Sequence, residues 1–233
     1  MADEPTVLQL KFLGKPMGVL GYRPNGPSFA MEIAGSFLAA DHEISPLNMP
    51  MAGFAAGPRL FQGGDSPFAG GLPGFIADSL PDAWGEKMLR YSHPEIVTIL
   101  GKLSAIGERG PGGISFEPAL DARSAKAPQS EKLADLATRA NAMRADPIPL
   151  TSDRINDILA LASSSLGGAY PKTNAHLRLD SEFIDRREIL VGGPTPRGFT
   201  PCIVKFARSN DEAEGAVEYA LSQMAENLSL IHI

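Results

Sequence analysis

The stretch SSSLGGAYPKTNAHLRL, residues 163–179, decides how the second half of this chain folds. A helical pattern precedes it, and an alternating strand pattern follows. Gly167 and Gly168 allow a backbone to approach an anion closely, and Lys172 adds a positive charge. The stretch is not a GxxxxGK[ST] loop, because Pro171 replaces the required glycine and the order of helix and strand is reversed. Two interpretations stay open: a structural turn or a loop that holds phosphate.

The composition is that of an ordinary globular protein, and its 233 residues suffice for one large domain or two small ones. The net charge of −6 gives no footprint of a dedicated nucleic-acid binder. A single cysteine, Cys202, excludes a disulfide within the chain and fits a reducing compartment. The N-terminus lacks signal-peptide features, and no apolar run approaches the roughly 20 residues of a membrane helix. We therefore expect a cytoplasmic protein with no membrane and no direct nucleic-acid partner.

Strand patterns dominate the first third of the chain. TVLQLKFL, PMGVLGY and SFAMEI are short apolar runs separated by turn residues. Asn25 and Gly26 form a tight-turn signal, because both tolerate positive φ. A small antiparallel meander is predicted here, followed over residues 45–74 by loops with one or two short elements.

A core helix is predicted within GFIADSLPDAWGEKMLR, residues 74–90. Ser79 is a suitable N-cap. Leu80, Trp84 and Met88 fall on one face, which indicates a buried tryptophan.

Glycines are dense in LSAIGERGPGGISFEPA, residues 103–119. Their spacing does not match the dinucleotide pattern GxGxxG, and no helix follows. This segment predicts a turn followed by the strand ISFEP.

The composition changes at residues 121–150, which are rich in alanine and charge. One modest helical stripe runs through them: Leu133, Leu136 and Ala140. We place the domain boundary there, with a β-rich N-terminal subdomain at residues 1–120, a helical linker at 121–150 and a second domain beginning at 151–233. The expected fold class is α+β.

A lysine stands inside an apolar run near the end of the chain. FTPCIVKFARS, residues 199–209, predicts a buried strand with Lys205 on one face and Cys202, Val204 and Phe206 on the other. Because an unpaired buried charge is costly, Lys205 must reach water or a partner.

A helix is predicted after this strand, since residues 209–212 form a capping-box pattern. Its apolar stripe comprises Val217, Leu221, Met224 and Leu228. Glu218 lies at the edge of this stripe, within reach of Lys205. A glycine loop, a strand lysine and a helix glutamate follow one another in a kinase N-lobe. The alternative is an edge lysine with its head in water beside a surface glutamate.

Four segments make the chain similar to the HipA-like toxin kinases, serine/threonine kinases of bacterial toxin–antitoxin modules, over nearly its whole length. DSLPDAWG (78–85) resembles the N-terminal motif of that family, and IGERGPGGISFEP (106–118) resembles its loop–strand motif. SSSLGGAYPKT resembles its glycine loop, and IVKF resembles its ATP-contacting strand. The DSLPDAWG and GGAYPK segments are the most specific of these.

The resemblance implies that ATP and Mg²⁺ are cofactors and that a DNA-binding antitoxin and a protein substrate are partners. It implies nucleotide contacts from the glycine loop and from the lysine strand with its paired glutamate: Gly167, Gly168, Ala169, Lys172, Lys205 and Glu218. It also makes Ser165 the candidate for autophosphorylation. Tyr170 departs from the family, in which many relatives carry a basic or polar residue at this position.

A kinase also needs a base aspartate, a metal-binding asparagine and a metal-binding aspartate in its C-lobe. The 28 residues after Lys205 (233 − 205) match no such constellation, so no catalytic residue and no metal ligand is assigned. We therefore expect the N-terminal portion of a longer kinase, inactive by itself. The alternative is a non-catalytic module that engages an antitoxin or a partner kinase chain. A third interpretation is an unrelated α+β protein with structural glycine loops.

Overall fold

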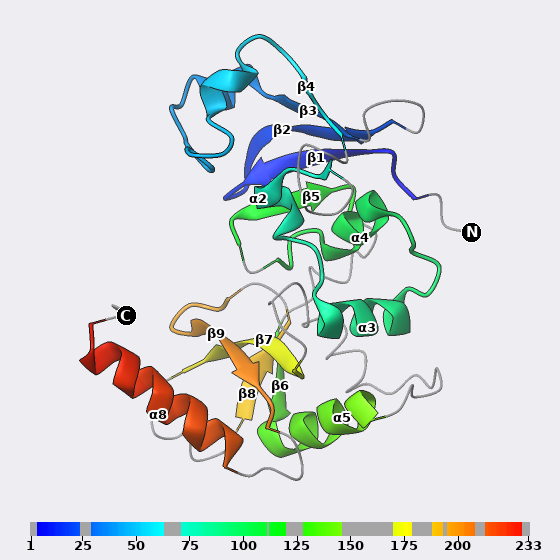
Figure 1. Cartoon of the computed structure of the whole chain (residues 1–233). Coiled ribbons are helices and arrows are strands. Elements are labelled where there is room, and N and C mark those ends of the chain that lie inside the picture. Colours follow the sequence, from blue (N-terminus) through cyan, green and yellow to red (C-terminus); the bar gives the residue numbers. More distant parts are fainter. Residues whose placement is uncertain are drawn as a thin grey trace.

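The fold contains two antiparallel sheets with helices packed beside them, as Figure 1 shows, and it is α+β as predicted. This computed structural model describes residues 4–23, 29–62, 71–110, 112–119, 128–145, 170–178, 188–192, 195–207 and 213–229. Within these ranges no helix is long and apolar enough to cross a membrane.

The first sheet has the strand order β4-β3-β2-β1-β5. Its strands are β1 (Val7–Phe12), β2 (Lys15–Tyr22), β3 (Phe29–Ile33), β4 (Arg59–Phe61) and β5 (Ile114–Glu117). Strands β1 to β3 form the predicted antiparallel meander. Buried and less buried side chains alternate in β3 and at the start of β1, whereas β2 buries Met17 and Leu20. β5 comes from much later in the chain and pairs with β1.

Short helices cover this sheet and close the first hydrophobic core. They are α1 (Gly35–Leu38), the 3-10 helix η1 (Met51–Phe54), α2 (Gly74–Ala77) and α4 (Ile99–Ile106). Leu8, Leu10 and Met31 from the strands pack with Leu100 and Leu103 of α4 in that core. The predicted loop region at 45–74 therefore carries η1 and β4, as expected, and the turn at Asn25–Gly26 lies outside the described residues.

The helix predicted after Ser79, within residues 74–90, is α3 (Ala83–Ser92), and the short helix α2 precedes it. The N-cap of α3 is Asp82, whose Oδ1 accepts a hydrogen bond from the Gly85 N–H at 2.7 Å, so the prediction of Ser79 as the cap is wrong. The physical reason is Pro81, which disfavours helical backbone at the residue before it. Trp84 is 3% exposed, as the apolar stripe predicted.

The second sheet has the strand order β6-β8-β7-β9. Its elements are β6 (Gln129–Lys132), α5 (Leu133–Ala145), β7 (Lys172–Leu177), β8 (Glu188–Val191), β9 (Thr200–Lys205) and the following α8 (Glu214–Asn227). The second core joins side chains of α3 and α5 to the sheet: Trp84, Met88, Leu136, Ala140, Met143, Ala175, Ile189, Val191 and Phe206. Residues 129–145, assigned above to a linker, thus supply a strand and a helix to the second sheet and core.

β9 is half-buried, which corrects the prediction of a buried strand. Its inner face is as predicted, with Cys202, Val204 and Phe206 against the second core. The other face is open, and Ile203 is 50% exposed. The reason is that, among the described residues, no hydrophobic cluster includes Ile203 or covers its face of β9.

α8 lies beside the second sheet in Figure 1 and buries none of its residues. It begins at Glu214 after Ala213. The capping-box residues 209–212 and the helical pattern that precedes residue 163 lie outside the described residues.

Candidate nucleotide site and the junction beside it

The structure brings Lys205 of β9 and Glu218 of α8 together, as their order in the sequence suggested. The Lys205 Nζ donates to both carboxylate oxygens of Glu218, at 3.0 and 3.1 Å. Both side chains are about half exposed, at 56% and 55%. An exposed pair of this kind contributes roughly 0–1 kcal/mol to stability. Lys205 therefore remains accessible to an anionic ligand.

Lys172 stands directly opposite Lys205 in the pairing of β7 with β9. Opposite residues of an antiparallel pair share one face of the sheet, and like charges placed this way repel each other. Each of the two lysines has its own carboxylate: Glu218 for Lys205, and Asp82 for Lys172. The sheet therefore presents two compensated lysines side by side on the face away from the second core.

Lys172 has surroundings quite different from those of Lys205. Its side chain is 3% exposed, and its Nζ lies 2.5 Å from the Oδ2 of Asp82, which is 11% exposed. The same Nζ donates to the carbonyl oxygen of Tyr170 at 3.3 Å. The backbone carbonyl of Lys172 accepts a hydrogen bond from the Trp84 Nε1–H at 2.9 Å. One turn of α3 thus holds both the side chain and the main chain of Lys172.

A further contact joins β7 to the glycine-dense segment. The Asn174 Nδ2 donates to the carbonyl oxygen of Arg109 at 3.5 Å. Segments DSLPDAWG, IGERG and PK, singled out separately in the sequence, therefore meet at the start of β7. We call Asp82, Trp84, Arg109, Lys172 and Asn174 the junction.

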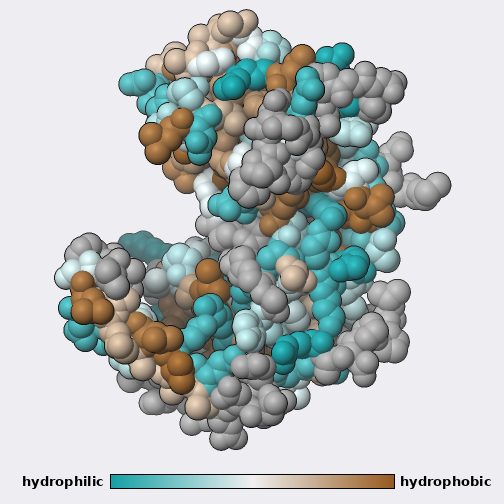
Figure 2. Space-filling model, viewed as in Figure 1, coloured by the Kyte–Doolittle hydropathy of each residue, from teal (hydrophilic) through white to brown (hydrophobic). Residues whose placement is uncertain are grey.

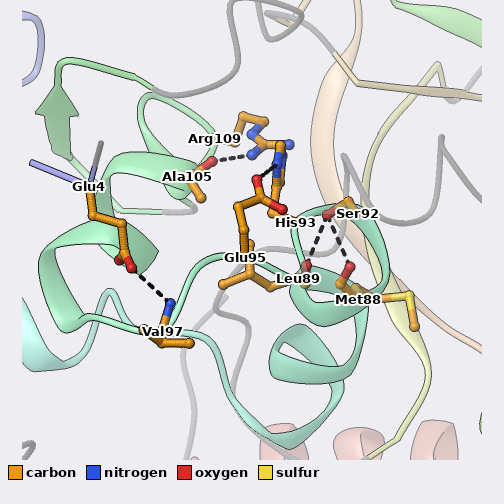
Figure 3. A network of polar contacts seen from close by, with 9 residues as sticks. All are labelled: Glu4, Met88, Leu89, Ser92, His93, Glu95, Val97, Ala105 and Arg109. Atoms are coloured by element: carbon orange, nitrogen blue, oxygen red, sulfur yellow. Dashed lines mark hydrogen bonds and ion pairs between the residues drawn. The ribbon is translucent and has the colours of Figure 1, made fainter. Parts of the chain in front are cut away.

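Figure 3 shows the polar contacts that hold the end of α3 and the segment after α4. The Ser92 hydroxyl donates to the carbonyl oxygens of Met88 and Leu89, at 3.1 and 3.3 Å. The Arg109 guanidinium donates to the carbonyl oxygen of Ala105. These contacts are local: the first two lie within α3, and the third joins Arg109 to the last turn of α4.

Glu4 ties the start of the chain to the same region (Figure 3). Its carboxylate accepts hydrogen bonds from the backbone N–H groups of Val97 at 3.3 Å and Thr98 at 2.9 Å. Burial raises the pKa of Glu4, but the hydrogen bonds from Thr98 and Val97 outweigh it and leave that pKa below its ordinary value. Glu4 thus stays ionised while it anchors the start of α4.

The structure describes only some of the residues that were predicted for the site. Ser165, Gly167, Gly168 and Ala169 lie outside the described residues, and their contacts with nucleotide remain predictions. Lys172, Lys205 and Glu218 are described, and their roles toward nucleotide also remain predictions.

Tyr170 and Cys202 lie close in sequence to the two lysines. Tyr170, the departure from the family pattern, is 45% exposed, and the Arg144 guanidinium lies 6.0 Å from the centre of its ring. Burial on the inner face of β9 raises the pKa of the Cys202 thiol. In the described ranges no three His, Cys, Asp or Glu side chains cluster so as to hold a metal ion.

Sequence reasoning missed Asp82 as part of this site. The residue was visible only as a member of DSLPDAWG, whose apolar stripe indicated a core helix. The available signal was the aspartate directly after Pro81, because aspartate is a preferred N-cap residue. Its carboxylate accepts the N–H of Gly85, three positions later. Nothing local in the sequence points to the ion pair with Lys172.

A comparison with protein families concerns the first sheet and its short helices. Residues 8–117 match the HipA N-terminal domain, a range that contains almost all of the first sheet together with α3 and α4. This match supports a HipA-like family for the N-terminal portion of the chain, and that family suggests a toxin–antitoxin context. Among curated proteins, none matches the chain significantly.

Proposed function

We propose that this chain carries the nucleotide-holding part of a HipA-like serine/threonine protein kinase, which transfers phosphate from ATP to a protein serine. The observation that carries the proposal is the Lys205–Glu218 pair at 3.0 and 3.1 Å, between a strand and the helix that follows it. In protein kinases a strand lysine contacts the α- and β-phosphates and pairs with a helix glutamate. The HipA N-terminal domain on the same chain supports this assignment.

The exposure of Lys205 supports the proposal. Lys205 is exposed on an edge strand, so phosphate oxygens can approach its ammonium without any charge becoming buried. Gly167, Gly168 and Ala169 precede β7 and would offer backbone N–H groups to the phosphates. Mg²⁺, when bound, neutralises the charge that develops on the transferred group. Ser165 is the proposed site of autophosphorylation.

Replacing Lys205 with alanine is expected to weaken ATP binding by about tenfold or more, because a hydrogen bond to a charged group is lost. Glu218→Gln should weaken binding less, since the lysine remains. Calorimetry of the 233-residue chain with ATP measures both effects. Lys11→Ala is the matched control, because Lys11 also pairs with a glutamate, Glu117, but in the first sheet. Equal ATP affinity in the parent and in Lys205→Ala would show that the assigned site is wrong.

A second candidate function is a binding module that engages a DNA-binding antitoxin or a partner kinase chain. The observation that favours it is α8, on which large apolar side chains are between 54% and 68% exposed: Val217, Tyr219, Leu221, Met224 and Leu228. Figure 2 shows hydrophobic atoms along this helix. Exposed apolar patches often mark protein interaction sites. Absence of ATP binding, together with association of the chain with its antitoxin, would favour this second function.

A further inference from the structure

We propose that Asp82 is a positioning residue that fixes the start of β7 through Lys172, and that Lys172 serves as an anchor instead of a phosphate ligand. The part of this inference that concerns ATP affinity rests on the proposed function. The part that concerns the ion pair does not.

The burial of Lys172 carries the first step. Its side chain is 3% exposed, and its Nζ lies 2.5 Å from the Asp82 Oδ2. For Lys172 to reach a phosphate, this ammonium would have to leave Asp82 behind as a nearly buried, uncompensated charge. Breaking a buried pair in this way is strongly unfavourable. Lys205, half exposed on the same face, meets no such obstacle.

Asp82 is itself held firmly, which suits a positioning role. Its Oδ1 accepts the Gly85 N–H at 2.7 Å as the N-cap of α3, and its Oδ2 faces Lys172. α3 is fixed in the second core by Trp84 and Met88, both fully or almost fully buried. The carboxylate therefore has one oxygen for the helix and one for the lysine.

The effect of this contact extends to the proposed nucleotide site. Lys172 pairs with Lys205 across β7 and β9, so a fixed Lys172 fixes the strand that carries Lys205. Asp82 lies within the range that matches the HipA N-terminal domain. That domain would thus set the position of the nucleotide-binding lysine through two successive contacts.

Three variants of the 233-residue chain test the proposal. Asp82→Asn removes the charge but keeps an N-cap, because asparagine caps helices about as well as aspartate. Lys172→Met removes the ammonium and keeps most of the side-chain length. The double variant completes a mutant cycle. Glu86→Gln is the matched control, since Glu86 also lies on α3 and pairs at 2.5 Å with Lys102, away from β7.

Trp84 supplies a spectroscopic readout of the junction. It is the one tryptophan of the chain, and its indole donates to the Lys172 carbonyl. Asp82→Asn and Lys172→Met are each expected to shift its emission to the red and to increase its quenching by acrylamide. Glu86→Gln should leave both unchanged.

If Lys172 is an anchor, the double-mutant cycle should show a particular pattern of ATP affinities. Each single variant should lower ATP affinity by about tenfold, and the double variant should lower it no further, because both changes remove one interaction. The double variant should also unfold at a higher urea concentration than either single variant, since it leaves no unpaired charge.

Two results of the ATP titrations would overturn the proposal, and a third would leave the decision to the unfolding cycle and the Trp84 emission. If Lys172→Met weakens ATP binding as much in the Asp82→Asn background as in the parent, Lys172 is a phosphate ligand. If Asp82→Asn strengthens ATP binding, the carboxylate masks the lysine. If the parent binds no ATP, the proposed function fails, and the unfolding cycle and the Trp84 emission decide the anchor by themselves. Additive unfolding effects with unchanged emission would then refute it.

Discussion

Replacing Trp84 with alanine is expected to lower the free energy of unfolding by about 3 to 5 kcal/mol. The indole is 3% exposed in the second core, so its loss leaves a cavity between α3, α5 and the second sheet. It also removes the hydrogen bond to the Lys172 carbonyl at 2.9 Å. Urea unfolding followed by far-ultraviolet circular dichroism measures the change without relying on tryptophan fluorescence.

Trp84→Phe separates the two contributions of this side chain. Phenylalanine keeps much of the apolar volume but has no N–H, so an expected loss of about 1 to 3 kcal/mol reports the unpaired carbonyl and the smaller ring. If Trp84→Ala unfolds within about 1 kcal/mol of the parent, α3 does not contribute to the second core.

The Trp84 experiment is informative because α3 lies in the range that matches the family model and also packs in the second core. By sequence it belongs to the HipA N-terminal domain, and by packing it belongs to the core of the second sheet. α3 therefore links the matched range to the second sheet, because Trp84 and Met88 pack in the second core. The same helix carries Asp82, so the stability of the second core and the proposed placement of Lys172 depend on one element.

The sequence predicts those features of the site that are local. Lys205 and Glu218 lie 13 positions apart, on a strand and the helix directly after it, so their contact follows from pattern and order alone. The β1–β3 meander is predictable for the same reason, since consecutive alternating runs pair with their neighbours.

The features that escape prediction depend on tertiary packing. Trp84 and Lys172 are 88 positions apart, and no local pattern predicts that α3 contacts β7. The apolar run around Lys205 suggested a buried strand, whereas the face that carries Ile203 is open. Sheet order and long-range ion pairs are decided by how the two cores meet, which hydrophobic periodicity does not encode.

Gly18→Ala is expected to destabilise the HipA N-terminal domain by about 3 kcal/mol, the upper end for overpacking. Gly18 lies in β2 between Leu10 of β1 and Ile33 of β3. A Cβ at this position would lie 2.1 Å from the Glu32 carbonyl oxygen and 3.0 Å from the Ile33 Cα. Both are backbone atoms, so the side chains cannot relieve the clash by rotating, and β2 must separate from β3.

Gly21→Ala, in the same strand, is the matched control. A Cβ at Gly21 would lie 3.7 Å from the Val7 Cγ2, an ordinary contact, so this variant should stay within about 1 kcal/mol of the parent. Thermal unfolding of the parent and the two variants, followed by circular dichroism, compares them directly. Because the two substitutions add the same methyl group to the same strand, a difference between them reports the backbone approach at Gly18 alone. Equal unfolding temperatures for Gly18→Ala and Gly21→Ala would mean that the Glu32 carbonyl lies too far from Gly18 for an added Cβ to clash with it.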